Sequence, residues 1–122
     1  MRNYRVRILP RAVADLDSII GWLYDKSPRG AAALLAAFEK AQIGLKRSPE
    51  AYSIAPESEV LGVELRQAFF KTRKGNTYRM IVKLNSDDIQ ILRIRGPGQP
   101  LLTSDEFNPR QESEKFQPKT DK

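Results

Sequence analysis

The chain contains no cysteine and no histidine. Without cysteine it can form no disulfide bridge, thiolate zinc site or cysteine nucleophile. Without histidine it lacks the commonest metal ligand and any imidazole base. Most metal sites and every mechanism that needs an imidazole are therefore excluded, and we expect neither a metal nor a cofactor.

Long apolar runs are also missing. No segment approaches the roughly 18 uninterrupted apolar residues of a membrane span. The first seven residues lead directly into a strand-like alternation, with no apolar signal-peptide stretch after the charged start. We therefore expect a cytoplasmic protein that does not enter a membrane.

The composition that remains is that of one soluble domain. The chain has 122 residues, of which 40% are hydrophobic and 30% are charged. A chain of this length forms one domain with a modest core. The formal net charge of +6 favours an acidic or polyanionic partner.

The N-terminal half predicts one strand and two helices. Residues 4–8 alternate between apolar and basic side chains, which is typical of a half-buried strand. Apolar residues then recur at helical spacing over 11–24, with Asp15 and Asp17 placed to complement the helix dipole and with Trp22 and Tyr24 as core and rim residues. Ser27 is expected to cap a second helix that has Pro28 at its first position. Ser48-Pro49 ends this helix, and the two helices form an antiparallel hairpin.

The C-terminal half predicts three strands, over residues 64–71, 77–84 and 89–95. Turn-rich connections at 74–76 and 85–88 join them into an antiparallel meander. Residues 51–63 show no period and predict a loop. The fold class is therefore α+β, in the order β-α-α-β-β-β, with the helices packed on one face of the sheet.

Composition places a boundary after the last strand. Residues 1–96 are expected to form the folded domain. Residues 97–122 form a polar tail, and from 103 onward its only large apolar side chains are Phe107 and Phe116. Such a segment is expected to be flexible by itself, and either phenylalanine could dock on the domain or on a partner.

Positive charge is concentrated on the predicted meander. Residues 66–95 carry eight basic and two acidic side chains, a net charge of +6, whereas residues 11–50 carry a net charge of +1. Strand alternation places Arg79 opposite Tyr78 and Met80, and it groups Arg66 with Ala68. We expect the apolar side to lie under the helices, so that four arginines converge on the uncovered face: Arg66, Arg79, Arg93 and Arg95.

Guanidinium groups on a rigid sheet suit phosphate or carboxylate recognition. The predicted binding residues for an anion or a nucleic acid are Arg66, Lys71, Arg73, Arg79, Arg93 and Arg95. The alternative is an ordinary solvated sheet face. The basic hairpin tip at 71–74 is more often a soluble turn than a ligand site.

Several short motifs, in this order and spacing, resemble the ParE/RelE superfamily of toxins from bacterial type II toxin–antitoxin systems, often labelled plasmid stabilisation proteins. The resemblance covers residues 3–95. The motifs are Ala14-Asp15-Leu16 with Ile19, Ser27-Pro28-Arg29-Gly30-Ala31, Leu45 with Ser48-Pro49, Leu61-Gly62, Leu65-Arg66, Tyr78-Arg79 and Ile91-Leu92-Arg93-Ile94-Arg95.

The resemblance implies a helix hairpin against a small antiparallel sheet. It also implies a cognate antitoxin that wraps the toxin with a helix and an extended segment. Two activities are implied: RelE-like members cut mRNA in the ribosomal A site with basic residues on the sheet, whereas ParE-like members poison DNA gyrase without known chemistry.

This chain departs from the nuclease pattern. Relatives often carry a His or Tyr just after the last strand, where this chain has Gly96-Pro97, and no Tyr follows Tyr78. If the protein is a metal-independent endoribonuclease, the residues expected to stabilise the transition state are Arg66, Lys71, Arg79 and Arg95. A base is harder to find, with Glu64 and Lys71 as the candidates.

The missing base and the long helices favour gyrase poisoning over mRNA cleavage, and whether the chain is an enzyme stays open. The expected partners are a cognate antitoxin and either gyrase or the ribosome with its mRNA. A third alternative is an inactive relative that acts only as an antitoxin-bound partner.

Overall fold

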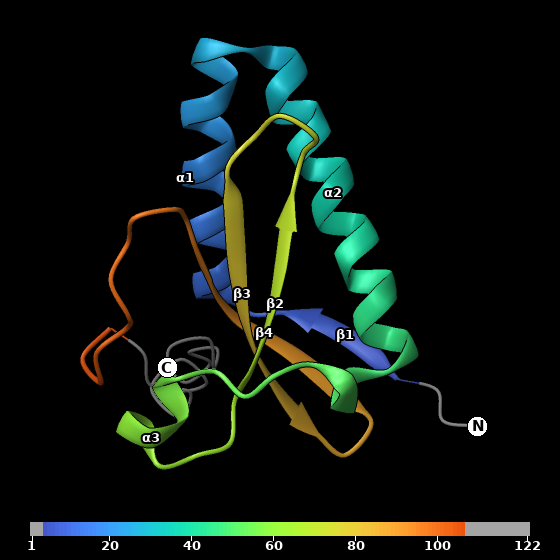
Figure 1. Ribbon diagram of the computed structural model, residues 1–122, viewed down its shortest axis with the longest axis vertical. Helices are drawn as coiled ribbons and strands as arrows, with labels where there is room; N and C mark the ends of the chain where they lie inside the picture. Colours follow the sequence, from blue (N-terminus) through green and yellow to red (C-terminus); the bar gives the residue numbers. More distant parts are fainter. Residues whose placement is uncertain (1–3, 107–122) are drawn as a thin grey trace, which may run out of the picture.

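The computed structural model describes residues 4–106, in which a long helix hairpin packs on a four-stranded sheet (Figure 1). This arrangement confirms the predicted α+β class and element order. The elements are β1 (Arg5–Ile8), α1 (Pro10–Lys26), α2 (Pro28–Arg47), the 3₁₀ turn η1 (Pro49–Ala51), α3 (Glu57–Leu61), β2 (Arg66–Lys71), β3 (Thr77–Asn85) and β4 (Asp88–Arg95).

The strands lie in the order β1-β4-β3-β2. β2, β3 and β4 form the predicted antiparallel meander, and β1 pairs in parallel with the first half of β4, as far as Ile91. The pairing of β3 with β4 shifts by one residue between Ile81 and Val82. β2 is therefore one edge of the sheet, and β4 is covered by β1 over only part of its length.

Proline and serine set the ends of the long helices. Pro10 and Pro28 occupy the first turns of α1 and α2, where a missing N–H is harmless. The Ser27 hydroxyl accepts a hydrogen bond from the amide of Gly30 at 2.9 Å, which confirms the predicted cap. The first turn of α1 holds no acidic residue, so the predicted dipole role of Asp15 and Asp17 is wrong.

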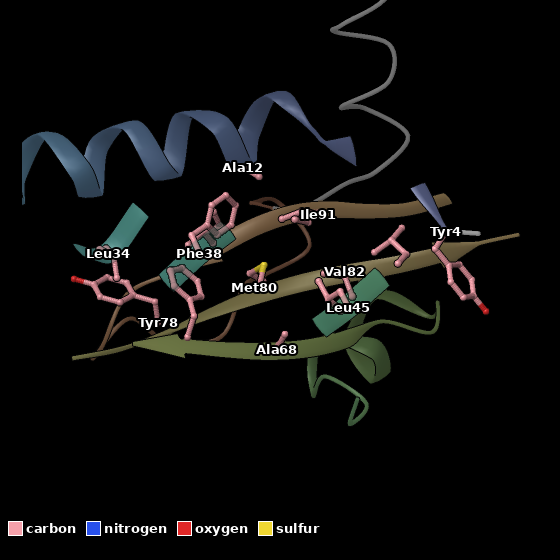
Figure 2. Packing of buried hydrophobic residues seen from close by; sticks show 13 residues of the cluster. Tyr4, Ala12, Leu34, Phe38, Leu45, Ala68, Tyr78, Met80, Val82 and Ile91 are labelled. Carbon is pink, nitrogen blue, oxygen red and sulfur yellow. The ribbon is translucent and has the colours of Figure 1, made fainter. Parts of the chain in front are cut away.

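The main core lies between the helix hairpin and one face of the sheet, called here the helix side (Figure 2). Phe38 of α2 is buried against Phe70, with ring centroids 5.3 Å apart, and Phe70 stacks on Tyr78 at 5.7 Å. Other buried members are Tyr4, Ala12, Leu34, Leu45, Ala68, Met80, Val82, Ile89, Ile91 and Ile94. The helical and strand periods of the sequence therefore meet in one continuous core.

Trp22 and Tyr24 lie outside that core, contrary to the prediction. Their exposed fractions are 58% and 60%. The stripe of α1 that packs inward instead comprises Leu16, Ile19 with Ile20, and Leu23. Trp22 is covered only partly, by Lys26, whose Nζ lies 4.8 Å from the ring centroid.

A second, smaller cluster covers the opposite face of the sheet, called here the far side. Its buried members are Ala55, Leu65, Ile81, Leu92 and Leu102, with Leu9, Leu61 and Val63 packed against them. The predicted loop at 51–63 thus contains η1 and α3, which bring apolar side chains to this face.

The first part of the predicted tail belongs to the same cluster. Residues 97–106, called here the strap, run back along the domain, and Leu102 is buried with an exposed fraction of 2%. Two adjacent leucines, Leu101 and Leu102, in an otherwise polar segment carry too little periodicity to predict that Leu102 docks here. The predicted docking of Phe107 or Phe116 lies outside the described residues.

Candidate functional site

Arg79 forms a buried ion pair on the far side. Its Nη1 donates to Glu57 Oε1 at 2.9 Å and its Nη2 donates to Oε2 at 2.7 Å. Glu57, at the start of α3, is fully buried and also accepts the Leu102 amide at 3.1 Å. Burial alone raises the pKa of Glu57, but hydrogen bonds from Arg79 and Leu102 and the charge of Arg79 outweigh it and lower the pKa. The ionised pair ties α3, β3 and the strap together.

Arg93 is paired with Asp15 of α1. Its Nε and Nη2 donate to the two carboxylate oxygens at 2.8 and 3.0 Å. Asp15 Oδ2 also accepts the backbone amide of Ile94 at 2.9 Å. Since β1 pairs with β4 only as far as Ile91, Asp15 satisfies a donor on the part of β4 that extends past β1.

Arg95 is buried beneath the strap without a carboxylate hydrogen bond among residues 4–106. Its exposed fraction is 6%, its Nη2 donates to the Pro100 carbonyl at 2.7 Å, and its Nε has no hydrogen-bond partner among those residues. Arg95 of β4 lies directly opposite Arg79 of β3 in the strand register, so two cationic side chains are neighbours on the far side. Among residues 4–106, Arg95 is therefore the far-side arginine that lacks a carboxylate hydrogen bond.

Arg66 lies on the helix side, since register pairs it with Val82. It donates to the carbonyls of Glu50 and Tyr52 at 3.1 and 2.6 Å and pairs with Glu64 at 2.7 Å. Lys71 at the end of β2 and Arg73 in the following turn are exposed. The six predicted binding residues therefore do not gather on one face.

The expectation of four arginines on an uncovered face is wrong. Arg79, Arg93 and Arg95 do share the far side, but α3, α1 and the strap supply partners that cover them. The period-two pattern already grouped Arg66 with Ala68, which packs in the main core. Strand alternation therefore contained the signal that Arg66 faces away from the other three arginines. The short α3 and the strap have no sequence pattern that would predict their contacts with those arginines.

A groove of about 310 Å³ opens on the other side of the molecule, between α2 and the edge strand β2. Small residues of α2 shape one wall, and Gly44 leaves room for Tyr52: a Cβ there would lie 2.6 Å from the tyrosine oxygen. The remaining lining residues are Ala37, Lys40, Ala41, Phe69, Phe70, Lys71 and Thr77. The groove is thus apolar, with two lysines at its border.

Within residues 4–106, the second half of the β2 edge beside this groove makes no backbone hydrogen bond to its outer side. The Gln67 amide donates outward to the Ser53 carbonyl at 2.9 Å, which covers the first half of the edge. Backbone groups alternate along a strand, so those of Phe69 and Lys71 point to the same outer side. This half of the edge can accept another strand.

Neither Glu64 nor Tyr78 is arranged to act as a general base. Glu64, one candidate base, is held by Arg66, and burial raises the pKa of Tyr78 above its ordinary range. Within residues 4–106 no three acidic side chains are grouped to hold a metal ion. The same range contains no helix with the length and apolar character that a bilayer span requires.

The fold, the far-side arginines and the groove define a small basic protein with a helix hairpin, a meander sheet and an open groove at one sheet edge. A sequence model described as the ParE toxin of the type II toxin–antitoxin system parDE matches residues 6–99. This chain therefore belongs to the ParE toxin family, which confirms the resemblance, and it is a ParE-like toxin of a type II module.

A solved structure titled as a chromosomal ParDE toxin–antitoxin system from P. aeruginosa has a similar fold. The TM-score is 0.59 at 21% sequence identity, and the match covers 77% of this chain and 96% of the other. A search of curated proteins gave no match.

Proposed function

We propose that this toxin stops growth by poisoning DNA gyrase in the cytoplasm and that a cognate antitoxin neutralises it. The observation that carries the proposal is the ParE family match over residues 6–99. The described site agrees with a binding toxin, because Arg79 and Arg93 are held in ion pairs with Glu57 and Asp15 inside the fold. A protein that acts by binding needs no side chain to transfer a proton.

An expression experiment in growing cells distinguishes gyrase from the ribosome as the target. The protein is expressed from an inducible promoter in cells that lack the antitoxin, and incorporation of labelled thymidine and labelled methionine is followed. We expect DNA synthesis to fall before translation does. Translation failing first would contradict gyrase as the target, and normal growth with the protein present would indicate an inactive relative.

The mRNA endoribonuclease is the second candidate because Arg79, Arg93 and Arg95 occupy one side of the sheet. Primer extension on translated mRNA tests it directly. A nuclease would give cuts at the ribosomal A site, and these would be lost in Arg79→Ala. The gyrase proposal predicts no such cuts in wild type.

The groove between α2 and β2 is our proposed docking place for an extended segment of the antitoxin. A strand added at Phe69 and Lys71 would gain main-chain hydrogen bonds, and its apolar side chains would enter the groove. Lys40 and Lys71 at the border favour acidic residues on that segment.

Charge reversal tests this docking place. Lys71→Glu is compared with Lys74→Glu, which lies in the exposed β2–β3 turn and does not line the groove. We expect Lys71→Glu to weaken binding of the antitoxin encoded next to this gene by about tenfold, and Lys74→Glu to leave it nearly unchanged. Equal affinities for the two variants would remove the groove from the antitoxin interface.

A further inference from the structure

The strap makes contacts that resemble those of a bound anion. The carbonyl oxygen of Pro100 accepts from Arg95 at 2.7 Å, and that of Glu106 accepts from Arg11 at 2.7 Å and also from Arg93. The strap also brings a carboxylate: hydrogen bonds from Thr103, together with the charges of Arg95 and Arg93, hold the pKa of Glu106 below its ordinary value. Acceptor oxygens and one negative charge are what a phosphodiester group offers to guanidinium groups.

The arginine beneath the strap is incompletely compensated. Arg95 is nine-tenths buried, Pro100 is its acceptor in the strap, and its Nε has no partner among residues 4–106. A buried guanidinium with an unsatisfied donor is unfavourable, and an anion with several oxygens satisfies it better than one carbonyl does. The pairs that hold Arg79 and Arg93 come from α3 and α1, so they stay when the strap leaves.

The strap is attached in a way that allows it to leave as a unit. Gly96 connects it to β4, and Gly98 near its start has a φ of +81°, a backbone conformation that glycine adopts at little cost. Its apolar anchor is Leu102, buried in the small far-side cluster, whereas the neighbouring Leu101 is 49% exposed. The main core on the helix side includes no strap residue.

We propose that residues 97–106 are an internal pseudo-ligand that covers a phosphate-binding site centred on Arg95, with Arg93 and Arg11 at its border. A nucleic-acid phosphodiester is the ligand class, and it binds when the strap swings away. This inference goes beyond the gyrase and antitoxin proposals and does not depend on either.

The test compares Leu102→Ser with its matched control Leu101→Ser, using a short fluorescein-labelled single-stranded oligonucleotide and fluorescence anisotropy at fixed low salt. Leu102→Ser weakens the anchor and raises the population of the open form, so apparent affinity rises by about tenfold. Leu101→Ser binds as wild type does. Adding Arg95→Gln to Leu102→Ser abolishes the gain. Equal affinity of the two leucine variants, no binding by any of them, or an unchanged affinity after Arg95→Gln would each overturn the proposal.

Hydrogen exchange of the wild-type protein gives an independent answer if Leu102→Ser does not fold. The Leu102 amide, which donates to Glu57, exchanges faster when the oligonucleotide is bound, because the strap has been displaced. Oligonucleotide binding that leaves this amide equally protected would overturn the proposal. Neither gyrase nor antitoxin is present, so a negative result here is distinct from failure of the proposed function.

Discussion

The two faces of the sheet are held in different ways. The helix side is packed by a continuous apolar core that α1 and α2 share with all four strands. The far side has a small apolar cluster. Its periphery is held by the Arg79–Glu57 and Arg93–Asp15 ion pairs and by the strap. From this difference we expect the helix side to dominate the stability of the fold, whereas the far side places the charged groups and should be rearranged at smaller cost.

The largest effect is expected on the helix side. Phe38→Ala removes a buried ring that contacts Phe70, and we expect it to lower the free energy of unfolding by about 3–5 kcal/mol. Denaturant unfolding followed by circular dichroism measures the change. Phe69→Ala, at an exposed position of β2, is the control and should cost less than about 1 kcal/mol. Similar losses for the two variants would mean that the core is not where the structure places it.

The second largest effect is expected from loss of the Arg79–Glu57 ion pair on the far side. Glu57→Gln leaves Arg79 without its carboxylate, and we expect a loss of about 2–3 kcal/mol in the free energy of unfolding. Glu59→Gln, exposed on the same short helix, is the matched control and should change little. A second variant, Arg79→Met combined with Glu57→Gln, should recover part of the loss because the charge of Arg79 is no longer buried without its carboxylate. A double variant less stable than Glu57→Gln alone would contradict this account of the pair.

The same pair predicts how stability depends on pH. Because the pKa of Glu57 in the folded protein lies below its ordinary value of 4.5, its contribution is complete above that value and is lost as pH falls through the folded pKa. Thermal unfolding between pH 6 and pH 3, in steps of about 0.5 pH units, should show wild type losing stability more steeply than Glu57→Gln. Parallel curves for the two proteins would show that Glu57 binds its proton equally in the folded and unfolded states.

The smallest effect concerns the joint between the two long helices. Ser27→Ala removes the hydroxyl that accepts from the Gly30 amide, and we expect a loss of about 1 kcal/mol in the free energy of unfolding. Ser18→Ala, exposed in the interior of α1, should leave stability unchanged or raise it slightly. If Ser18→Ala destabilises more than Ser27→Ala, the cap does not contribute as the geometry indicates.

The same contrast explains how much the sequence could predict. The helix side was predictable because Leu34, Phe38 and Leu45 repeat at helical spacing and Tyr78, Met80 and Val82 repeat at strand spacing. These patterns were sufficient to predict the fold class, the helix hairpin and the meander.

The far side was predicted only in part. Alternation correctly placed Arg79, Arg93 and Arg95 on one face, but their partners come from segments without a periodic signal. Glu57 lies in a helix of five residues, and Leu102 is the only strap residue in the far-side cluster. Contacts between single residues distant in sequence leave no local pattern, so the sequence could not show that this face is covered.

Purified gyrase provides the most direct test of the central claim that this ParE-family chain acts on that enzyme. The purified toxin is added to supercoiling and DNA-cleavage reactions, with heat-unfolded toxin as the control. The account predicts inhibited supercoiling together with a trapped covalent cleavage complex. Normal supercoiling and no trapped complex at a large excess of folded toxin would contradict it.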